Sequence, residues 1–174
     1  DTQTSRGLGD VYKRQTMHRG AKHAAEGLGV ELMFQIPKKW NPSEQVPILN
    51  AMIAKRPDAI LIAPTDKTQL IAPLKAAVDQ GIMVITVDTF IDDGKYQDGS
   101  GRGDFPMSYI ASDNVLGGRM AARALANSIG SKGKVYVSNT VPGVSTTDQR
   151  EEGFVSEMKN YPNIQVLKLS LIHI

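Results

Sequence analysis

The chain has 174 residues, of which 41% are hydrophobic and 22% charged, and its formal net charge at pH 7 is +2. This composition is typical of a globular domain and excludes a disordered or fibrous chain. Its basic residues are dispersed along the sequence, so nucleic acid is not an expected partner. Without cysteine, neither a disulfide framework nor a thiolate metal site can form. The longest apolar runs are strand-sized, so we expect no membrane insertion, and no secretory signal is recognisable at the start.

Helical and strand periodicities alternate from residue 16 onward, which is typical of βα units around a parallel sheet. In chain order the pattern predicts a helix over 16–28, a strand over 30–36, a helix over 43–56, a strand over 59–63, a helix over 67–80, strands over 83–87 and 108–112, a helix over 113–129, a strand over 133–139, a helix over 146–160 and a strand over 164–169. Most strands are continuously apolar, as expected of strands that are covered on both faces. The predicted fold class is therefore α/β with parallel sheets.

Several helix ends carry recognisable signals. Asp66 and Thr146 each precede a glutamine by three residues, the spacing of a reciprocal N-terminal cap, and Asp113 can cap its helix alone. Gly81 and Gly130 follow predicted helices at the position where glycine ends them. These signals predict where the helices begin and end.

Two adjacent glycines lie in the first turns of the helix predicted over 113–129. Each of Gly117 and Gly118 costs roughly 1 kcal/mol relative to alanine, so we expect them to serve either a close approach of this helix to its neighbours or a turn beside a ligand or hinge. The apolar periodicity of the same helix predicts a buried stripe. Its expected members are Leu116, Met120, Ala124, Leu125 and Ile129.

The two ends of the chain depart from the βα pattern. Residues 1–15 show neither alternation nor an apolar run, and residues 169–174 follow directly on a strand. Both segments resemble translated adapter sequence. We therefore expect 1–15 and 169–174 to be non-native tails, with the first strand of the fold missing.

The stretch from Asp88 to Pro106 is long for a connection in a compact α/β unit, and it lies beside the candidate site. It contains Asp92, Asp93 and Asp98, which suggest a calcium site. However, their spacing lacks the alternating oxygen ligands and terminal glutamate of an EF-hand loop. We therefore predict no metal site.

Ligands of open parallel sheets bind beyond the carboxyl ends of the strands, so the residues that follow each predicted strand are the candidates. Asp88 follows a continuous apolar strand, where a carboxylate needs donors. A carboxylate accepts two hydroxyls and a guanidinium donates a planar fork, so Asp88 and Arg150 facing one cleft would suit a polyol such as a sugar. The alternatives are a turn role for Asp88 and a solvated side chain for Arg150. The further candidates are Thr89, Phe90, Ser112 and Val141.

An enzyme on a doubly wound sheet would need a nucleophile with its base, a dinucleotide fingerprint or a phosphate-binding loop. The glycine-rich stretches have none of these spacings, and neither Ser112 nor Ser145 has a suitably placed base. We therefore expect no enzymatic activity and no cofactor.

Four blocks, "ILIAPTD" (60–66), "VITVD" (84–88), "YIASDNVLGGRMAARALA" (109–126) and "DQREEGF" (148–154), resemble in order and spacing the ribose-binding-protein branch of the periplasmic sugar-binding proteins. The resemblance implies the type I periplasmic-binding-protein fold of two Rossmann-like lobes. Here it implies an incomplete N-terminal lobe over 16–112 and the beginning of a C-terminal lobe over 113–168. It further implies a receptor that closes on a monosaccharide or related polyol and delivers it to the permease subunits of an ABC importer. Such receptors are periplasmic, or lipid-anchored at the surface of single-membrane bacteria.

By position, the resemblance makes Asp88 the acceptor of sugar hydroxyls and Arg150 the sugar-binding arginine. It places Ser112 near the cleft and makes Ser112 and Asp113 the hinge. Thr89 stands where ribose binders usually have an arginine, and Ala63 departs from their pattern as well, so ribose itself is not predicted.

An alternative is the effector-binding domain of a lactose-repressor-type regulator, which shares the fold. That class carries an N-terminal helix-turn-helix, and none is visible before residue 16.

Overall fold

The structure is a computed structural model that describes residues 8–91, 105–139 and 141–168. The chain divides into two compact units, residues 1–36 and residues 37–174. The expected lobe boundary at residue 112 stays a prediction.

The first unit contains helix α1, Leu8–Leu28. The helix begins eight residues before the predicted start at 16, since no proline interrupts 8–15. The strand predicted over 30–36 is wrong, because a strand exists only by pairing with another strand and the described part of this unit offers a helix. Instead, Phe34 stacks on His18 of α1, with ring centroids 3.8 Å apart and planes at 11°.

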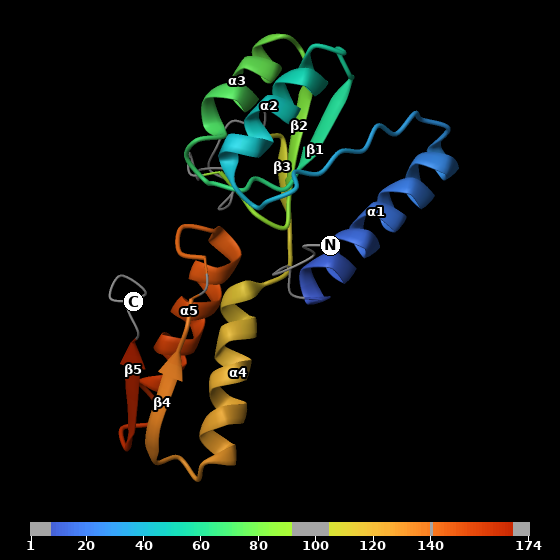
Figure 1. Ribbon diagram of the computed structural model, residues 1–174. Coiled ribbons are helices and arrows are strands. Elements are labelled where there is room, and N and C mark those ends of the chain that lie inside the picture. The colour runs from blue at the N-terminus through green and yellow to red at the C-terminus, as the bar shows by residue number, and fades with distance from the viewer. Residues whose placement is uncertain (1–7, 92–104, 140, 169–174) are drawn as a thin grey trace, which may run out of the picture. The chain divides into compact units, whose positions relative to one another are not determined.

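The second unit begins with a three-stranded parallel sheet of β1 (Ala59–Ile62), β2 (Met83–Val87) and β3 (Ser108–Ile110), in the order β1-β2-β3 (Figure 1). The register pairs Ile60 with Val84, and Thr86 with Tyr109. The parallel sheet predicted from the sequence is confirmed.

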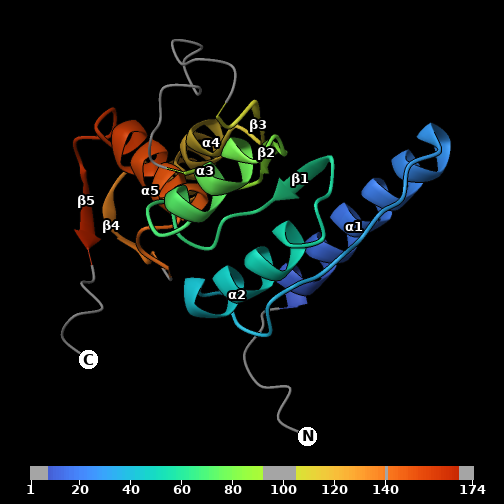
Figure 2. The same cartoon turned by 90° about the horizontal axis from the view of Figure 1, so that it is seen from above.

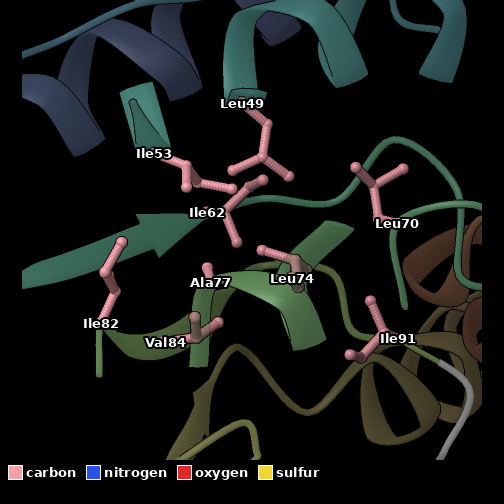
Figure 3. Close-up of a cluster of buried hydrophobic side chains, with 9 residues drawn as sticks. All are labelled: Leu49, Ile53, Ile62, Leu70, Leu74, Ala77, Ile82, Val84 and Ile91. Carbon is pink, nitrogen blue, oxygen red and sulfur yellow. The ribbon is translucent and has the colours of Figure 1, made fainter. Parts of the chain in front are cut away.

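Helices α2 (Pro42–Ile53) and α3 (Ile71–Asp79) share one hydrophobic core with this sheet (Figure 3). The core residues are Leu49, Ile53, Ile62, Leu70, Leu74, Ala77, Ile82, Val84 and Ile91. Along β1 and β2, burial alternates, and Leu61 and Met83 are exposed. The expectation of strands covered on both faces is therefore wrong for these two positions within the described residues.

The rest of the second unit consists of α4 (Asn114–Ser128), β4 (Gly133–Val137), α5 (Ser145–Met158) and β5 (Ile164–Lys168). Strands β4 and β5 pair in parallel, and α4 and α5 lie side by side in both views (Figures 1 and 2). Ala122, Ala126, Val135, Met158 and Ile164 form their core.

The buried stripe predicted on α4 is largely wrong. Leu116 is 45% and Met120 59% exposed, and Ala124 is also exposed, whereas Leu125 and Ile129 are partly buried against the core. The face of α4 that is buried is the one with small residues, Asn114, Gly118, Ala122 and Ala126. Apolar periodicity could not find this face, because close packing against another helix selects for small side chains rather than hydrophobic ones.

The predicted helix ends were met in part. Asp113 caps α4, with its carboxylate accepting from the Leu116 N–H at 2.8 Å. Asp66 accepts from the Gln69 N–H at 2.7 Å as expected, but this turn precedes α3, which begins at Ile71. The cap expected at Thr146 is wrong, because α5 already begins at Ser145 and its N-cap Val144 has no side-chain bond. Gly81 (φ +85°) and Gly130 (φ +65°) follow α3 and α4 in left-handed conformations, as predicted.

Candidate functional site

Asp88 forms a sharp corner at the carboxyl end of β2. Its φ is +64°, and the Thr89 N–H donates to the Val87 carbonyl at 2.7 Å, which closes a three-residue γ-turn with Asp88 at its centre. A non-glycine residue in this conformation costs roughly 1–3 kcal/mol and persists only where its surroundings hold it. Two contacts with the segment 108–113 do so: the Asp88 N–H donates to the Ile110 carbonyl at 2.9 Å, and the Tyr109 hydroxyl donates to the Asp88 carbonyl at 3.1 Å.

The two residues after Asp88 form hydrogen bonds with the segment that follows β1 and with the start of α5. Thr89 is 2% exposed and its hydroxyl donates to the Pro64 carbonyl at 2.7 Å, so its side chain joins the segments that follow β1 and β2. The Phe90 N–H donates to the Ser145 hydroxyl oxygen at 3.2 Å. The Phe90 ring packs edge-on against Tyr109 with centroids 5.5 Å apart. The corner thereby contacts the first residue of α5.

Arg150 lies in α5, five residues after Ser145 and therefore about 7.5 Å from it along the helix axis. The residue is exposed, but its side chain has a defined partner: Nε donates to the Asn114 Oδ1 at 2.9 Å. The buried Asn114 amide in turn donates through Nδ2 to the Ser112 carbonyl at 3.0 Å. The segment 108–113 thus contacts Asp88 directly and is connected to Arg150 through Asn114.

The backbone of Arg150 is held against α4 at Gly118. A Cβ built on Gly118 would collide with the Arg150 carbonyl oxygen, and a Cβ built on Gly153 would collide with the Val115 carbonyl. The two helices therefore contact each other through glycines. Gly118 meets the expectation of a close approach, whereas Gly117 has open space around its Cβ position.

The loop between β4 and α5 is organised by side-chain contacts. Asn139 Nδ2 donates to Asp148 at 2.9 Å and to Glu151 at 3.2 Å, and its Oδ1 accepts from the Val141 N–H at 3.1 Å. The Thr147 hydroxyl donates to the Val141 carbonyl at 2.8 Å. Val141 is exposed, with its backbone fixed on both sides.

Gln45 of α2 is a buried residue that fixes the end of β1 and was not anticipated from the sequence. Its Nε2 donates to the Ala63 carbonyl at 2.8 Å, and its Oε1 accepts from the Thr65 N–H at 2.7 Å. One signal was available: Gln45, Leu49 and Ile53 are spaced four apart and share the buried face of α2. A polar residue in such a series needs buried partners.

Two carboxylates have shifted pKa values. Burial raises the pKa of Asp66, but hydrogen bonds from the backbone and side chains of Gln69 and Thr68 outweigh it, so the net direction is downward. The hydrogen bonds from Arg123 lower the pKa of Glu157. Asp66 therefore stabilises its turn as a carboxylate.

Some of the expected site residues are connected to one another by hydrogen bonds and ring contacts, and the others have separate roles. The contacts above connect Asp88, Phe90, Arg150 and Ser112, and Thr89 is directed into the interior of its own sheet unit. Val141 belongs to the loop before α5, and Asp113 caps α4. Asn114, which contacts both Ser112 and Arg150, was missed because this is a tertiary contact with no local sequence signal.

Some predictions lie outside the described residues: Asp92, Asp93 and Asp98 of the long loop, residues 1–7 of the expected N-terminal tail, and the segment 169–174. Among the helices of the described ranges, none is long and apolar enough to cross a membrane.

A family model, curated relatives and solved structures all match this chain to the same family. The family model of a periplasmic binding protein domain matches residues 9–172. The ribose import binding protein RbsB of Bacillus subtilis is 30% identical over 139 residues, which are 80% of this chain and 42% of that protein. An ABC transporter solute-binding protein from Agrobacterium vitis, solved with bound α-D-tagatopyranose, is 65% identical, with a TM-score of 0.82 over 88% of this chain and 52% of that one.

A periplasmic solute-binding protein of an ABC transporter from Actinobacillus succinogenes, solved with bound D-allose, is 30% identical with a TM-score of 0.73, over 88% of this chain and 52% of that one. The chain thus spans about half the length of the relatives it matches. The type I periplasmic-binding-protein fold predicted from the sequence is confirmed. The chain belongs to the periplasmic binding protein family.

Proposed function

We propose that the natural full-length protein carrying this chain is a periplasmic receptor that binds a monosaccharide between two lobes and delivers it to the permease of an ABC importer. Similarity to the solute-binding proteins of Agrobacterium vitis and Actinobacillus succinogenes supports this proposal over an effector domain of a transcriptional regulator. The protein acts by binding and closure, without catalysis and without a cofactor. Ser112 and Asp113, which end the segment 108–113, are the hinge in this proposal.

The observation that carries the proposal is the strained corner at Asp88. A glycine would adopt a φ of +64° without cost, yet the position carries a carboxylate. The corner lies at the carboxyl end of the central strand, which is where parallel sheets bind ligands. A strained residue that adds no apolar contact to the core is better explained by a binding role than by stability.

The groups connected to this corner have the chemistry that a sugar requires. Asp88 supplies an acceptor for two hydroxyls, and Arg150 supplies planar N–H donors. The half-buried Phe90 supplies an aromatic face for the apolar side of a sugar ring. Ser112 and Val141 are proposed as further contacts, and Thr89 acts by fixing the corner through Pro64.

The class of sugar follows from the relatives. The Agrobacterium vitis protein at 65% identity was solved with α-D-tagatopyranose, and the Actinobacillus succinogenes protein at 30% identity with D-allose. We therefore propose a hexose in its ring form, with D-tagatose as the first ligand to test.

The test is calorimetric titration of the natural full-length protein with D-tagatose, D-allose and D-ribose. We expect Asp88→Ala to lower the affinity by about 2 kcal/mol, roughly 30-fold, because sugar hydroxyls lose their acceptor in a closed site. Arg150→Lys should also weaken binding severalfold, because an ammonium cannot donate a planar fork.

Two exposed residues provide matched controls: Asp79→Ala at the end of α3 and Arg56→Lys after α2 should leave the affinity unchanged. An Asp88→Ala variant with full affinity would remove Asp88 from the site. Absence of binding to all three sugars would overturn the proposed function.

A further inference from the structure

We propose that Asn114 is the positioning residue of Arg150: its side-chain amide fixes the direction of the guanidinium and thereby raises the affinity for sugar. This inference rests on the proposed function, because it takes Arg150 as a sugar contact. It concerns a residue that follows the expected hinge directly and that itself needs no contact with the ligand.

The orientation of the Asn114 amide is set by its two partners. An amide group has one oxygen, which accepts, and one nitrogen, which donates. The Ser112 carbonyl is an acceptor and can bond only the amide nitrogen, which lies 3.0 Å away. The oxygen must then face the opposite partner, the Arg150 Nε, at 2.9 Å. Asn114 is 4% exposed, so its amide has little access to solvent and depends on these two partners.

This contact leaves the ligand-binding end of the arginine available. A guanidinium carries five N–H donors in one plane, and a bond at Nε fixes that plane while the four N–H groups of the two terminal nitrogens remain for a ligand. An exposed arginine otherwise loses rotamer entropy when a ligand orders it. Ordering by Asn114 in the absence of sugar removes part of that cost from binding.

The backbone of Arg150 is fixed by the same helix face. Asn114 and Gly118 lie one turn apart on α4, and the Arg150 carbonyl packs against Gly118. Main chain and side chain of Arg150 are therefore both held by the first turns of α4. A role in helix capping does not account for the Asn114 side chain, because the cap of α4 is already made by Asp113.

The first test is the NMR signal of the Arg150 Nε–H, assigned by its loss in Arg150→Lys and recorded on the sugar-free protein at pH 7. We expect a signal protected from solvent exchange in the parent protein and lost in Asn114→Ala. The Asn114→Asp variant keeps an oxygen for Nε but loses the donor to the Ser112 carbonyl, so it should retain at most a weaker protection. Asn127→Ala, an exposed asparagine of the same helix, is the matched control and should change nothing. A protected Nε–H in folded Asn114→Ala would overturn the proposal.

The second test is a double-mutant cycle on D-tagatose affinity by calorimetry. Asn114→Ala should weaken binding severalfold in the parent protein, and by no more than Arg150→Lys does, because it acts only through the arginine. In the Arg150→Lys background it should have no further effect, because the group through which it acts is gone. Equal effects in both backgrounds would mean that Asn114 changes the affinity independently of Arg150, which overturns the proposal.

The two tests separate this proposal from the proposed function. If the parent protein binds none of the three sugars, the proposed function fails, and with it the effect on affinity. The Nε–H signal still decides whether Asn114 orders the arginine. Should Asn114→Ala fail to fold, Asn114→Asp takes its place in the cycle, with a smaller loss expected because the acceptor remains.

Discussion

Gly118 lies so close to Arg150 that the carbonyl oxygen of the arginine occupies the space a β-carbon on the glycine would need. Such a carbon would also fall 2.8 Å from the Phe154 amide nitrogen. Both atoms belong to the backbone of α5, which cannot move aside without shifting the whole helix.

Alanine at this position is therefore expected to separate α4 from α5. We predict that Gly118→Ala lowers the free energy of unfolding by about 2 kcal/mol, as overpacking does, despite the better helix propensity of alanine. Gly117→Ala is the matched control, because nothing lies within 4 Å of its β-carbon, and it should raise stability by about 0.5–1 kcal/mol. Urea unfolding followed by circular dichroism measures both, and equal effects of the two substitutions would contradict the packing described.

We predict that Asp88→Gly lowers the affinity for sugar without lowering the free energy of unfolding. Glycine adopts the observed φ of +64° freely, so the free energy of unfolding should stay equal or rise by up to about 1 kcal/mol, while sugar affinity falls as in Asp88→Ala. Ser131→Gly, at a φ of +55° after α4, should show the same change in stability without loss of affinity. Thermal unfolding and calorimetry on the same samples test this. A variant that loses stability but keeps its affinity would show that Asp88 serves the fold.

Gln45→Leu should destabilise the first sheet although it makes the interior more apolar. The substitution leaves the Ala63 carbonyl and the Thr65 N–H without the bonds they make to the amide, at a cost of about 1–3 kcal/mol for each group that stays unpaired. Gln80→Leu at the exposed end of α3 is the control and should change stability little. Denaturant midpoints measure the difference. A Gln45→Leu variant as stable as the parent would mean that water satisfies both groups.

The ion pair between α4 and α5 predicts a pH dependence of stability. Arg123 donates to Glu157 through Nε at 2.7 Å and Nη2 at 3.2 Å, and these bonds hold the pKa of Glu157 below its ordinary value of 4.5. A carboxyl whose pKa is lowered in the folded state contributes stability above its unfolded pKa and loses that contribution as the pH falls through the folded value. Relative to Glu157→Gln, the parent should be more stable at pH 7, and the difference should shrink below about 4.5.

Urea midpoints of both proteins between pH 7 and pH 3 give this comparison. Glu152→Gln, at an exposed position of the same helix, controls for the loss of one negative charge. A gap between parent and Glu157→Gln that stays constant over the whole range would show that the carboxylate form contributes nothing.

Predictions from the sequence were correct where a feature depends only on residues close to it in the chain. Strands β1 and β2 are short apolar runs, Asp113 needs only its own helix to be a cap, and Gly118 is costly in a helix without a reason. The predictions were wrong where a feature depends on packing against another helix or strand. The stripe of Leu116 and Met120 was placed inside because hydrophobic spacing does not reveal that α5 packs on the small residues of α4.

The candidate site divides in the same way. Asp88 is a candidate because its position after an apolar strand is visible in the sequence, and so is the turn that leads to Arg150. The strain at Asp88, the inward hydroxyl of Thr89 and the bonds of Asn114 arise from backbone geometry and from partners up to 36 residues away in the sequence. Such tertiary contacts cannot be predicted from local patterns in the sequence.

The position of β2 between β1 and β3 has a consequence for how the protein opens. Its backbone pairs on both edges, and Val84 and Thr86 are fully buried, so their amide protons should exchange with deuterium only when the whole sheet comes apart. Amides of β4, paired with β5, report on the other sheet. Matching exchange rates at β2 and β4 would identify one cooperative unit, whereas faster exchange at β4 would identify two parts that open independently, each with its own lifetime.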